Sequence, residues 1–256
     1  MSNFSGLYDY VRPILQGLTS ITGKKTFLIF IAAVATMFFF SFVVPIYSLG
    51  LSINVFNQGL APVYSTSFLA LGVISVLAIV FILVWLAELI VYINSYTRVM
   101  GAVKFSSLAK VSLGEYPRFF FATVFQYLVA IGGLILLVVP GLYFGVSNMF
   151  FNVALLSERQ TVYSSFKRSN YMARHNYWRS LLTFVVYIAL GAVLMYPVLS
   201  LGSLALVYRY LMASFFIGYL FTAYTSSSTH LFLEIKSSEK SDMQQRRQSI
   251  FGSNLR

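Results

Sequence analysis

Side chains that could do acid–base or nucleophilic chemistry are scarce in this sequence. Cysteine is absent, which excludes thiolate metal sites and cysteine nucleophiles. The two histidines, His175 and His230, are too few and too far apart for a zinc site. No nucleophile–base–acid set, glycine-rich phosphate loop or pair of metal-binding carboxylates can be assembled from the other residues. The sequence therefore predicts neither an enzyme nor a cofactor or metal site.

Glu88 is the only acidic residue well inside an apolar stretch. A charge in the middle of a membrane costs about 3 kcal/mol on insertion scales, so such a residue is a functional hypothesis by default. Polar residues at a similar expected depth join it in one candidate polar layer: Gln126, Asn148, Asn152, Ser227 and His230. Two interpretations stay open. The layer is either a packed set of interhelical hydrogen bonds, each contributing about 0.6 kcal/mol, or a hydrated cavity with Glu88 and His230 as a proton- or ligand-linked pair.

A second group of residues interleaves aromatic and basic side chains along positions 163–179. Aromatic rings at headgroup depth and basic groups above anionic lipid favour an interfacial helix. The candidate lipid-headgroup contacts are Arg168, Arg174, Trp178 and Arg179. Generic anchoring to the membrane explains this stretch, and a specific lipid or partner dock is the alternative.

The composition places these residues in a membrane protein. Of the 256 residues, 58% are hydrophobic and only 10% are charged, and the mean hydropathy is +0.78. A soluble domain carries about a quarter charged residues. The net charge of +11 comes from short basic stretches beside apolar ones, which indicates anionic lipid rather than nucleic acid, and no nucleic-acid-binding module is present.

Six apolar segments are candidate spans. About 20 residues cross the ~30 Å hydrocarbon core, and the fourth segment is shorter than that. The predicted spans are 27–47, 68–93, 119–139, 142–156, 181–199 and 210–233. We expect the third and fourth to form one hairpin that turns at Pro140-Gly141. The membrane domain, 26–236, would follow a cytoplasmic amphipathic arm at 1–25 and precede a cytoplasmic disordered tail at 237–256.

The distribution of basic residues predicts the orientation. All lysines and arginines except Arg209 fall in the N-terminal arm, in the second-to-third and fourth-to-fifth linkers, or in the tail. Basic loops stay on the cytoplasmic side. Both termini should therefore be cytoplasmic, with the uncharged loop 48–67 outside.

A weak internal repetition accompanies this topology. Three basic, partly amphipathic stretches, at 8–25, 105–118 and 163–179, each lead into a predicted hairpin. The fold expected is therefore all-α and integral to the membrane, a six-span bundle. It is either three parallel hairpin repeats, each preceded by an interfacial helix, or a chance convergence on the needs of an interface.

Several motifs carry a resemblance to a known family. The segment 132–143 is an apolar run that ends in Pro-Gly and a short span, and it is followed by Phe-Lys-Arg-Ser at 166–169 and Asn-Tyr-Trp-Arg at 176–179. The chain resembles the YciC-like inner-membrane proteins and the related membrane domain attached to some bacterial glycerophosphodiester phosphodiesterases. The resemblance implies a six-span prokaryotic inner-membrane protein without catalytic residues. The soluble phosphodiesterase domain is absent, so that activity is not expected.

Two functions are compatible with these features. The first is a non-catalytic accessory, scaffolding or lipid-organising subunit, with anionic lipids and a membrane-protein partner or a second copy as partners. The second is a small-molecule or lipid transporter that uses the polar layer as a cavity. An intramembrane enzyme based on Glu88 and His230 is a distant third. Because no broken-helix binding site is discernible at mid-membrane, the sequence favours the first.

Overall fold

The computed structural model of the chain describes residues 3–20, 22–43, 61–100, 105–136, 138–200 and 206–253, and the regular elements within these ranges are all helical. The prediction of an all-α protein is thereby confirmed. The helices are α1 (Asn3–Ser20), α2 (Lys24–Phe38) with one π-helical turn η1 (Phe39–Val43), α4 (Ala61–Met100), α5 (Phe105–Leu136), α6 (Val138–Ser147), α7 (Phe151–Ser157), α8 (Val162–His175), α9 (Tyr177–Ser200) and α10 (Leu206–Ser253).

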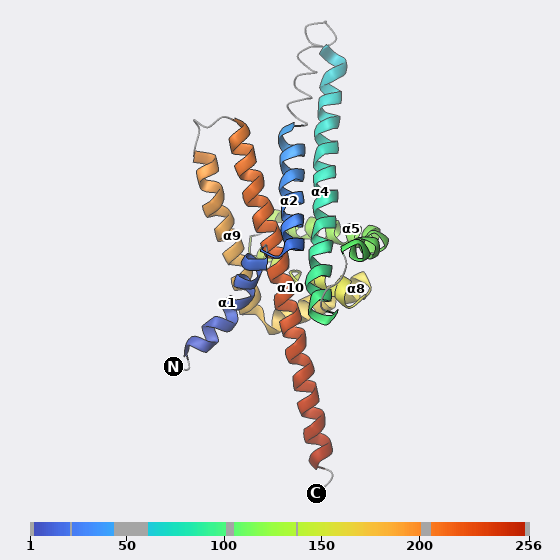
Figure 1. Ribbon diagram of the computed structural model, residues 1–256, viewed down its shortest axis with the longest axis vertical. Helices are drawn as coiled ribbons and strands as arrows, with labels where there is room; N and C mark the ends of the chain where they lie inside the picture. Colours follow the sequence, from blue (N-terminus) through green and yellow to red (C-terminus); the bar gives the residue numbers. More distant parts are fainter. Residues whose placement is uncertain are drawn as a thin grey trace.

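Four helices, α2, α4, α9 and α10, run along the long axis of the molecule (Figure 1). Three segments in the described residues are long and apolar enough to cross a membrane: Lys24–Phe42, Val73–Ser95 and Tyr177–Val198. They correspond to the first, second and fifth predicted spans. The upright part of α10 includes the sixth predicted span, but tyrosine, serine and threonine residues dilute its apolar character. The end of the first predicted span, at residue 47, lies outside the described residues.

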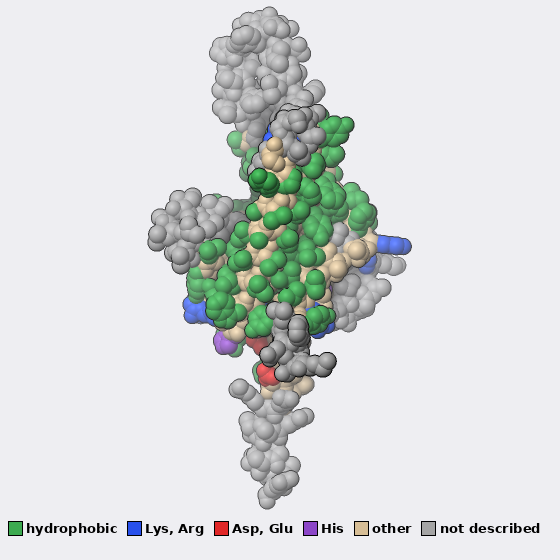
Figure 2. Space-filling model, turned by 90° about the vertical axis from the view of Figure 1, so that its left-hand side faces the viewer, with side chains coloured by type: hydrophobic (Ala, Val, Ile, Leu, Met, Phe, Trp, Pro, Cys, Tyr) green, Lys and Arg blue, Asp and Glu red, His purple; other side chains and the backbone are tan. Residues whose placement is uncertain are grey.

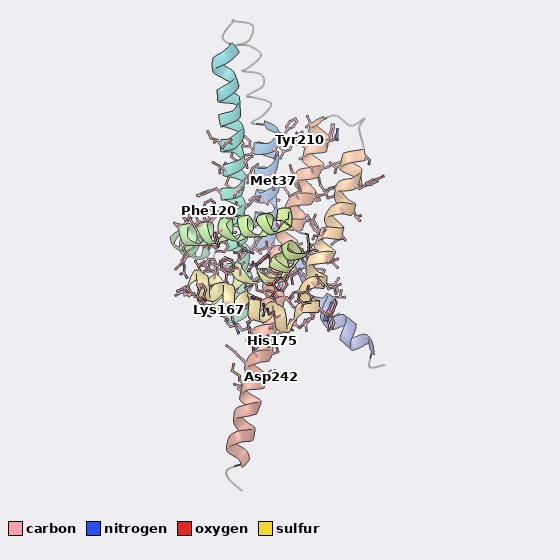
Figure 3. The ribbon with its side chains drawn as sticks, turned by 180° about the vertical axis from the view of Figure 1, so that it is seen from behind. Met37, Phe120, Lys167, His175, Tyr210 and Asp242 are labelled. Carbon is pink, nitrogen blue, oxygen red and sulfur yellow. The ribbon has the colours of Figure 1, made fainter. Side chains whose placement is uncertain are left out.

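Helices α5 and α8 lie across the upright helices instead of along them (Figures 1 and 3). Helices α5 and α6 pack against each other as the expected hairpin. However, this hairpin crosses α4, so the prediction that it stands upright as the third and fourth spans is not confirmed. The basic stretch 105–118 and the predicted third span are parts of one continuous helix, α5, that includes Pro117.

The predicted turn does not fall on Pro140-Gly141, because both residues lie within α6. Pro140 lies in the first turn of α6, where the missing backbone N–H costs little because that group would lack an intrahelical partner anyway. A further turn, at residues 148–150, separates α6 from α7. The predicted fourth span, 142–156, is therefore interrupted by this turn.

The C-terminal segment is helical in the structure, whereas the sequence led us to expect a disordered tail at 237–256. Helix α10 continues to Ser253 and extends beyond the rest of the molecule (Figure 1). Between residues 234 and 251 the chain contains no proline or glycine and is rich in Glu, Lys, Gln and Arg, which favour helix. The segment also extends an existing helix, so it needs no new nucleus.

The packed core lies at the end of the upright helices where α5, α7 and α8 cross them. Its fully buried large side chains include Phe119, Phe150, Phe151, Met172 and Phe232. Further up, α4 leaves Val73, Ile74, Val76 and Leu77 about 60% exposed. Hydrophobic side chains cover much of the face seen in Figure 2, and charged ones gather toward its lower end. Apolar surface of this extent marks contact with membrane or protein.

Candidate functional site

Two hydrogen bonds join the arms of the α5–α6 hairpin and its continuation into α7. The Gln126 Nε2 group donates to the Asn148 carbonyl oxygen at 2.9 Å, and the Thr123 hydroxyl donates to Asn152 Oδ1 at 3.0 Å. Residue numbers rise on one arm as they fall on the other, so the arms are antiparallel. Three of the predicted polar-layer residues, Gln126, Asn148 and Asn152, are therefore engaged within this hairpin.

Residues 225–230, the polar run of α10, face two neighbouring helices. On one side, Asn94 Nδ2 of α4 donates to Ser226 Oγ at 2.9 Å. On the other side, the Tyr187 hydroxyl of α9 lies 2.8 Å from Ser227 Oγ. His230, one turn further along α10, is half-buried. The run thus links α4, α10 and α9 by paired polar groups, a geometry that suits interhelical packing.

Glu88, like the Oε1 atom of Gln126, lies buried in the polar layer without a hydrogen-bond partner among the described residues. Its side chain is completely buried in α4, and neither carboxyl oxygen has a hydrogen-bond partner of normal geometry among the described residues. The buried Ser112 hydroxyl of α5 lies near it, and this hydroxyl also lacks a well-formed hydrogen bond. No hydrogen bond therefore joins Glu88 to His230, the residue to which the cavity interpretation linked it.

Tyr116 anchors α5 to α4 beside Glu88. Its hydroxyl donates to the Phe81 carbonyl oxygen, and the rings of Tyr116 and Phe81 are 4.8 Å apart, edge to face. Burial, and secondarily the nearby Glu88 carboxyl, raise the pKa of the Tyr116 phenol. The phenol therefore remains a neutral hydrogen-bond donor at physiological pH.

Two of the four predicted headgroup contacts form ion pairs within the chain. Arg168 lies 3.5 Å from Glu158 and 2.5 Å from Glu239. Glu158 also lies 3.0 Å from Lys236. We call these four residues the ion-pair lock, because they tie α8 and the end of α7 to the C-terminal part of α10.

Arg179 makes a second link of the same kind, at the start of α9. Its guanidinium lies 2.7 Å from the Glu234 carboxylate of α10. The Arg179 and Arg168 side chains are only 18% and 24% exposed. Both arginines therefore pair with carboxylates of this chain, which makes them less available to bind lipid headgroups.

The other two predicted contacts, Arg174 and Trp178, belong to an exposed row of residues that we call the aromatic–cationic stripe. Its members are Tyr163, Lys167, Tyr171, Arg174 and Trp178, and all five are exposed. Tyr163, Lys167, Tyr171 and Arg174 lie on α8, where their spacing of three or four residues places them on one helical face. Trp178 follows in the first turn of α9. Figure 3 shows Lys167 and His175 on the helix that crosses the bundle.

Aromatic side chains support both cations of the stripe. The Lys167 amine lies 4.8 Å from the centre of the Tyr163 ring. The Nε group of Arg174 donates to the Tyr143 hydroxyl of α6 at 3.0 Å. Among the described residues, neither cation has an acidic side chain within ion-pairing distance. Sequence reasoning did not single out Lys167, although its position four residues after Tyr163 and four before Tyr171 was the available signal.

Comparison with known proteins adds no relative: no family model, no curated protein and no solved structure matches this chain. The resemblance to YciC-like proteins therefore stays a prediction. The paired polar layer, the buried Glu88 and the aromatic–cationic stripe are therefore the features that bear on function.

Proposed function

We propose that this chain is a non-catalytic, multi-pass inner-membrane protein that serves as an accessory, scaffolding or lipid-organising subunit. Its basic ends would lie in the cytoplasm, as the positions of lysine and arginine predict. The resemblance to YciC-like proteins is compatible with this proposal. The observation that carries it is the pairing of polar side chains between helices in the layer where a transport cavity would be expected.

The hydrogen-bond donors and acceptors of the polar layer distinguish a packed interior from a hydrated cavity. A hydrated cavity needs polar groups that are left free to bind water or a substrate. Gln126, Thr123, Asn94 and Tyr187 instead direct their polar atoms at neighbouring helices. Side chains used in this way hold helices in register and favour a packed scaffold over a path through the membrane.

One observation favours the alternative, a transporter. Glu88 is fully buried and its carboxyl oxygens lack partners among the described residues. An acid in this position is a common feature of proton and ion pathways in membranes. Transport would require water to reach Glu88 in some state of the protein.

Labelling of introduced cysteines separates the two functions, because the chain has no cysteine of its own. We would compare Thr123→Cys and Ser227→Cys in the buried layer with Ser237→Cys, an exposed site on α10. A packed scaffold predicts that a small, membrane-permeant, water-requiring thiol reagent modifies only the cysteine at 237. Modification of the two layer sites at a comparable rate would reveal a hydrated layer and support transport instead.

Replacement of Glu88 provides a second readout. For a scaffold, Glu88→Gln should leave the protein folded and leave the labelling of Thr123→Cys and Ser227→Cys unchanged, because the amide keeps the size of the side chain. A transporter that opens around Glu88 would respond with altered labelling of these two sites. Intrinsic stability, measured by thermal unfolding in detergent, controls for a misfolded variant.

A further inference from the structure

We propose that α5 and α8 together form a binding site for anionic phospholipid, with the phosphate groups at Lys167 and Arg174 and the acyl chains over Phe121, Phe125 and Leu128. This inference rests on the membrane location in the proposed function, but it goes further by naming the ligand class and the side chains that bind it. It also replaces Arg168 and Arg179 with Lys167 as the principal basic contact beside Arg174.

Helices α5 and α8 lie side by side. The Arg118 guanidinium of α5 donates to the Gln160 carbonyl oxygen just before α8. Seven residues further along α5, the Phe125 ring packs edge-on against Phe166 of α8, with the ring centres 6.3 Å apart. Both contacts advance in the same direction along the two helices, so α5 and α8 are parallel over this stretch.

The outer face of α5 is apolar. Phe121, Phe125 and Leu128 are 72%, 56% and 62% exposed. Their spacing of four and three residues places them on one face of the helix. Three large hydrophobic side chains with this exposure are costly in water, at roughly 25 cal/mol for each Å² of apolar surface, so this face favours contact with acyl chains.

The two helices also lie at different depths. In Figures 1 and 3, α5 is nearer the apolar end of the upright helices, and α8 is nearer the C-terminal part of α10. The apolar face of α5 and the aromatic–cationic stripe thus lie one after the other along the expected membrane normal. This order matches that of a phospholipid, whose acyl chains continue from a charged headgroup into the hydrocarbon.

Charge complementarity selects anionic lipid. Lys167 and Arg174 are exposed and lack acidic neighbours in the described part of the chain. They are seven residues apart, or about 10 Å along a helix, so each can meet its own phosphate. Tyr163 and Trp178, 70% and 71% exposed, flank them with the amphipathic rings that favour headgroup depth.

The test uses the full-length protein, purified in neutral detergent and supplied with lipid. The wild type, the double variant Lys167→Gln/Arg174→Gln and the control Lys240→Gln/Arg246→Gln would be titrated with phosphatidylglycerol and with phosphatidylcholine of the same chain length. The control removes two positive charges from the end of α10. Bound lipid would be counted by native mass spectrometry, and thermal unfolding would be followed in parallel.

We expect the wild type and the control to bind phosphatidylglycerol in preference to phosphatidylcholine. The double variant should bind phosphatidylglycerol more weakly by roughly fivefold for each charge removed, as follows from the attraction of a basic residue to an anionic surface. Phe121→Gln/Phe125→Gln should weaken binding of both lipids, because it removes two of the three large side chains from the apolar face of α5. Inorganic phosphate alone should not stabilise the wild type.

Equal binding of the two lipids by the wild type would overturn the inference, as would unchanged phosphatidylglycerol affinity in a folded double variant. Stabilisation by inorganic phosphate equal to that by phosphatidylglycerol would assign the site to free anions instead. None of these results alters the cysteine labelling of the polar layer, so failure of the lipid site remains distinguishable from failure of the scaffold proposal.

Discussion

Gly17 of α1 and Ser227 of α10 are in direct contact, with no room for a side chain on the glycine. A Cβ atom built on Gly17 would lie 1.8 Å from Ser227 Oγ and 2.6 Å from the Ala223 carbonyl oxygen. Ser227 cannot readily turn away, because its hydroxyl is hydrogen-bonded to Tyr187. The N-terminal arm is thus docked on the last helix at the polar run that links α4, α10 and α9.

Substitution of this glycine tests the docking. Gly17→Ala should destabilise the protein by about 1 to 3 kcal/mol, the usual cost of overpacking, because the backbone of α10 cannot yield. Thermal or denaturant unfolding in detergent would measure the change. Gly114→Ala is the matched control, since a Cβ at Gly114 has no neighbour within 4 Å and alanine favours helix over glycine. Equal effects of the two substitutions would contradict a close helix crossing at Gly17.

The ion pair between Arg179 and Glu234 should contribute measurably to stability. Its side chains are 18% and 27% exposed, so we expect a coupling energy of about 1 to 2 kcal/mol, between the values for exposed and buried pairs. A double-mutant cycle with Arg179→Gln and Glu234→Gln would measure it. Arg118 and Glu115, 3.8 Å apart and more than 40% exposed, serve as the control, with less than about 0.5 kcal/mol expected. A larger coupling for the control pair would refute this ranking.

The ion-pair lock should hold the first turns of the C-terminal extension of α10. Glu239→Gln removes the carboxylate that pairs with Arg168, so backbone amides after residue 238 should exchange with solvent faster. Amides at 220–230 should keep their protection, because they lie within the packed bundle. Hydrogen exchange with mass spectrometry measures both regions. Unprotected amides at 237–243 in the wild type would instead support the disordered tail expected from the sequence.

The orientation in the membrane can be read by reagents that cannot cross it. Cysteines placed at Thr22 and Ser237, both exposed, should be protected in intact cells and react once the membrane is permeabilised. A cysteine at Ser52, a position of the uncharged loop 48–67 that lies outside the described residues, should react in intact cells. These outcomes follow from the basic residues near both termini. Labelling of the cysteine at 237 in intact cells would place the C-terminus outside and reverse the topology.

The sequence predicted helices wherever an apolar stretch had sufficient length, but it did not predict their direction. Segment 119–139 is long enough to span a membrane, and nothing in its composition separates a span from a helix that lies across the bundle. The choice depends on tertiary contacts, such as Tyr116 with the Phe81 carbonyl and Phe125 with Phe166. These partners are distant in sequence, so periodicity and length carry no information about them.

In the basic linker, positions 163–179, the sequence also could not predict which basic side chains form ion pairs within the chain. Residue type and position identified Arg168 and Arg179 as cations at an interface, but their partners on α10 are 71 and 55 residues further along the chain. Only the folded structure shows which basic side chains pair with carboxylates and which are exposed without such a pair among the described residues. In contrast, the polar-layer residues were predicted from type and expected depth alone, since polar groups are rare in apolar spans and costly to bury there without a partner.

Helix α10 contacts α1, α2, α4, α7 and α9, yet it is synthesised after all of them. The docking place of the N-terminal arm, together with the partners of Asn94, Tyr187 and Arg179, does not exist until that helix has been synthesised. Assembly of the bundle must therefore wait until α10 has been synthesised, and a nascent chain that stops before α10 would present unmatched polar groups and an undocked α1 to the cell's quality-control proteases.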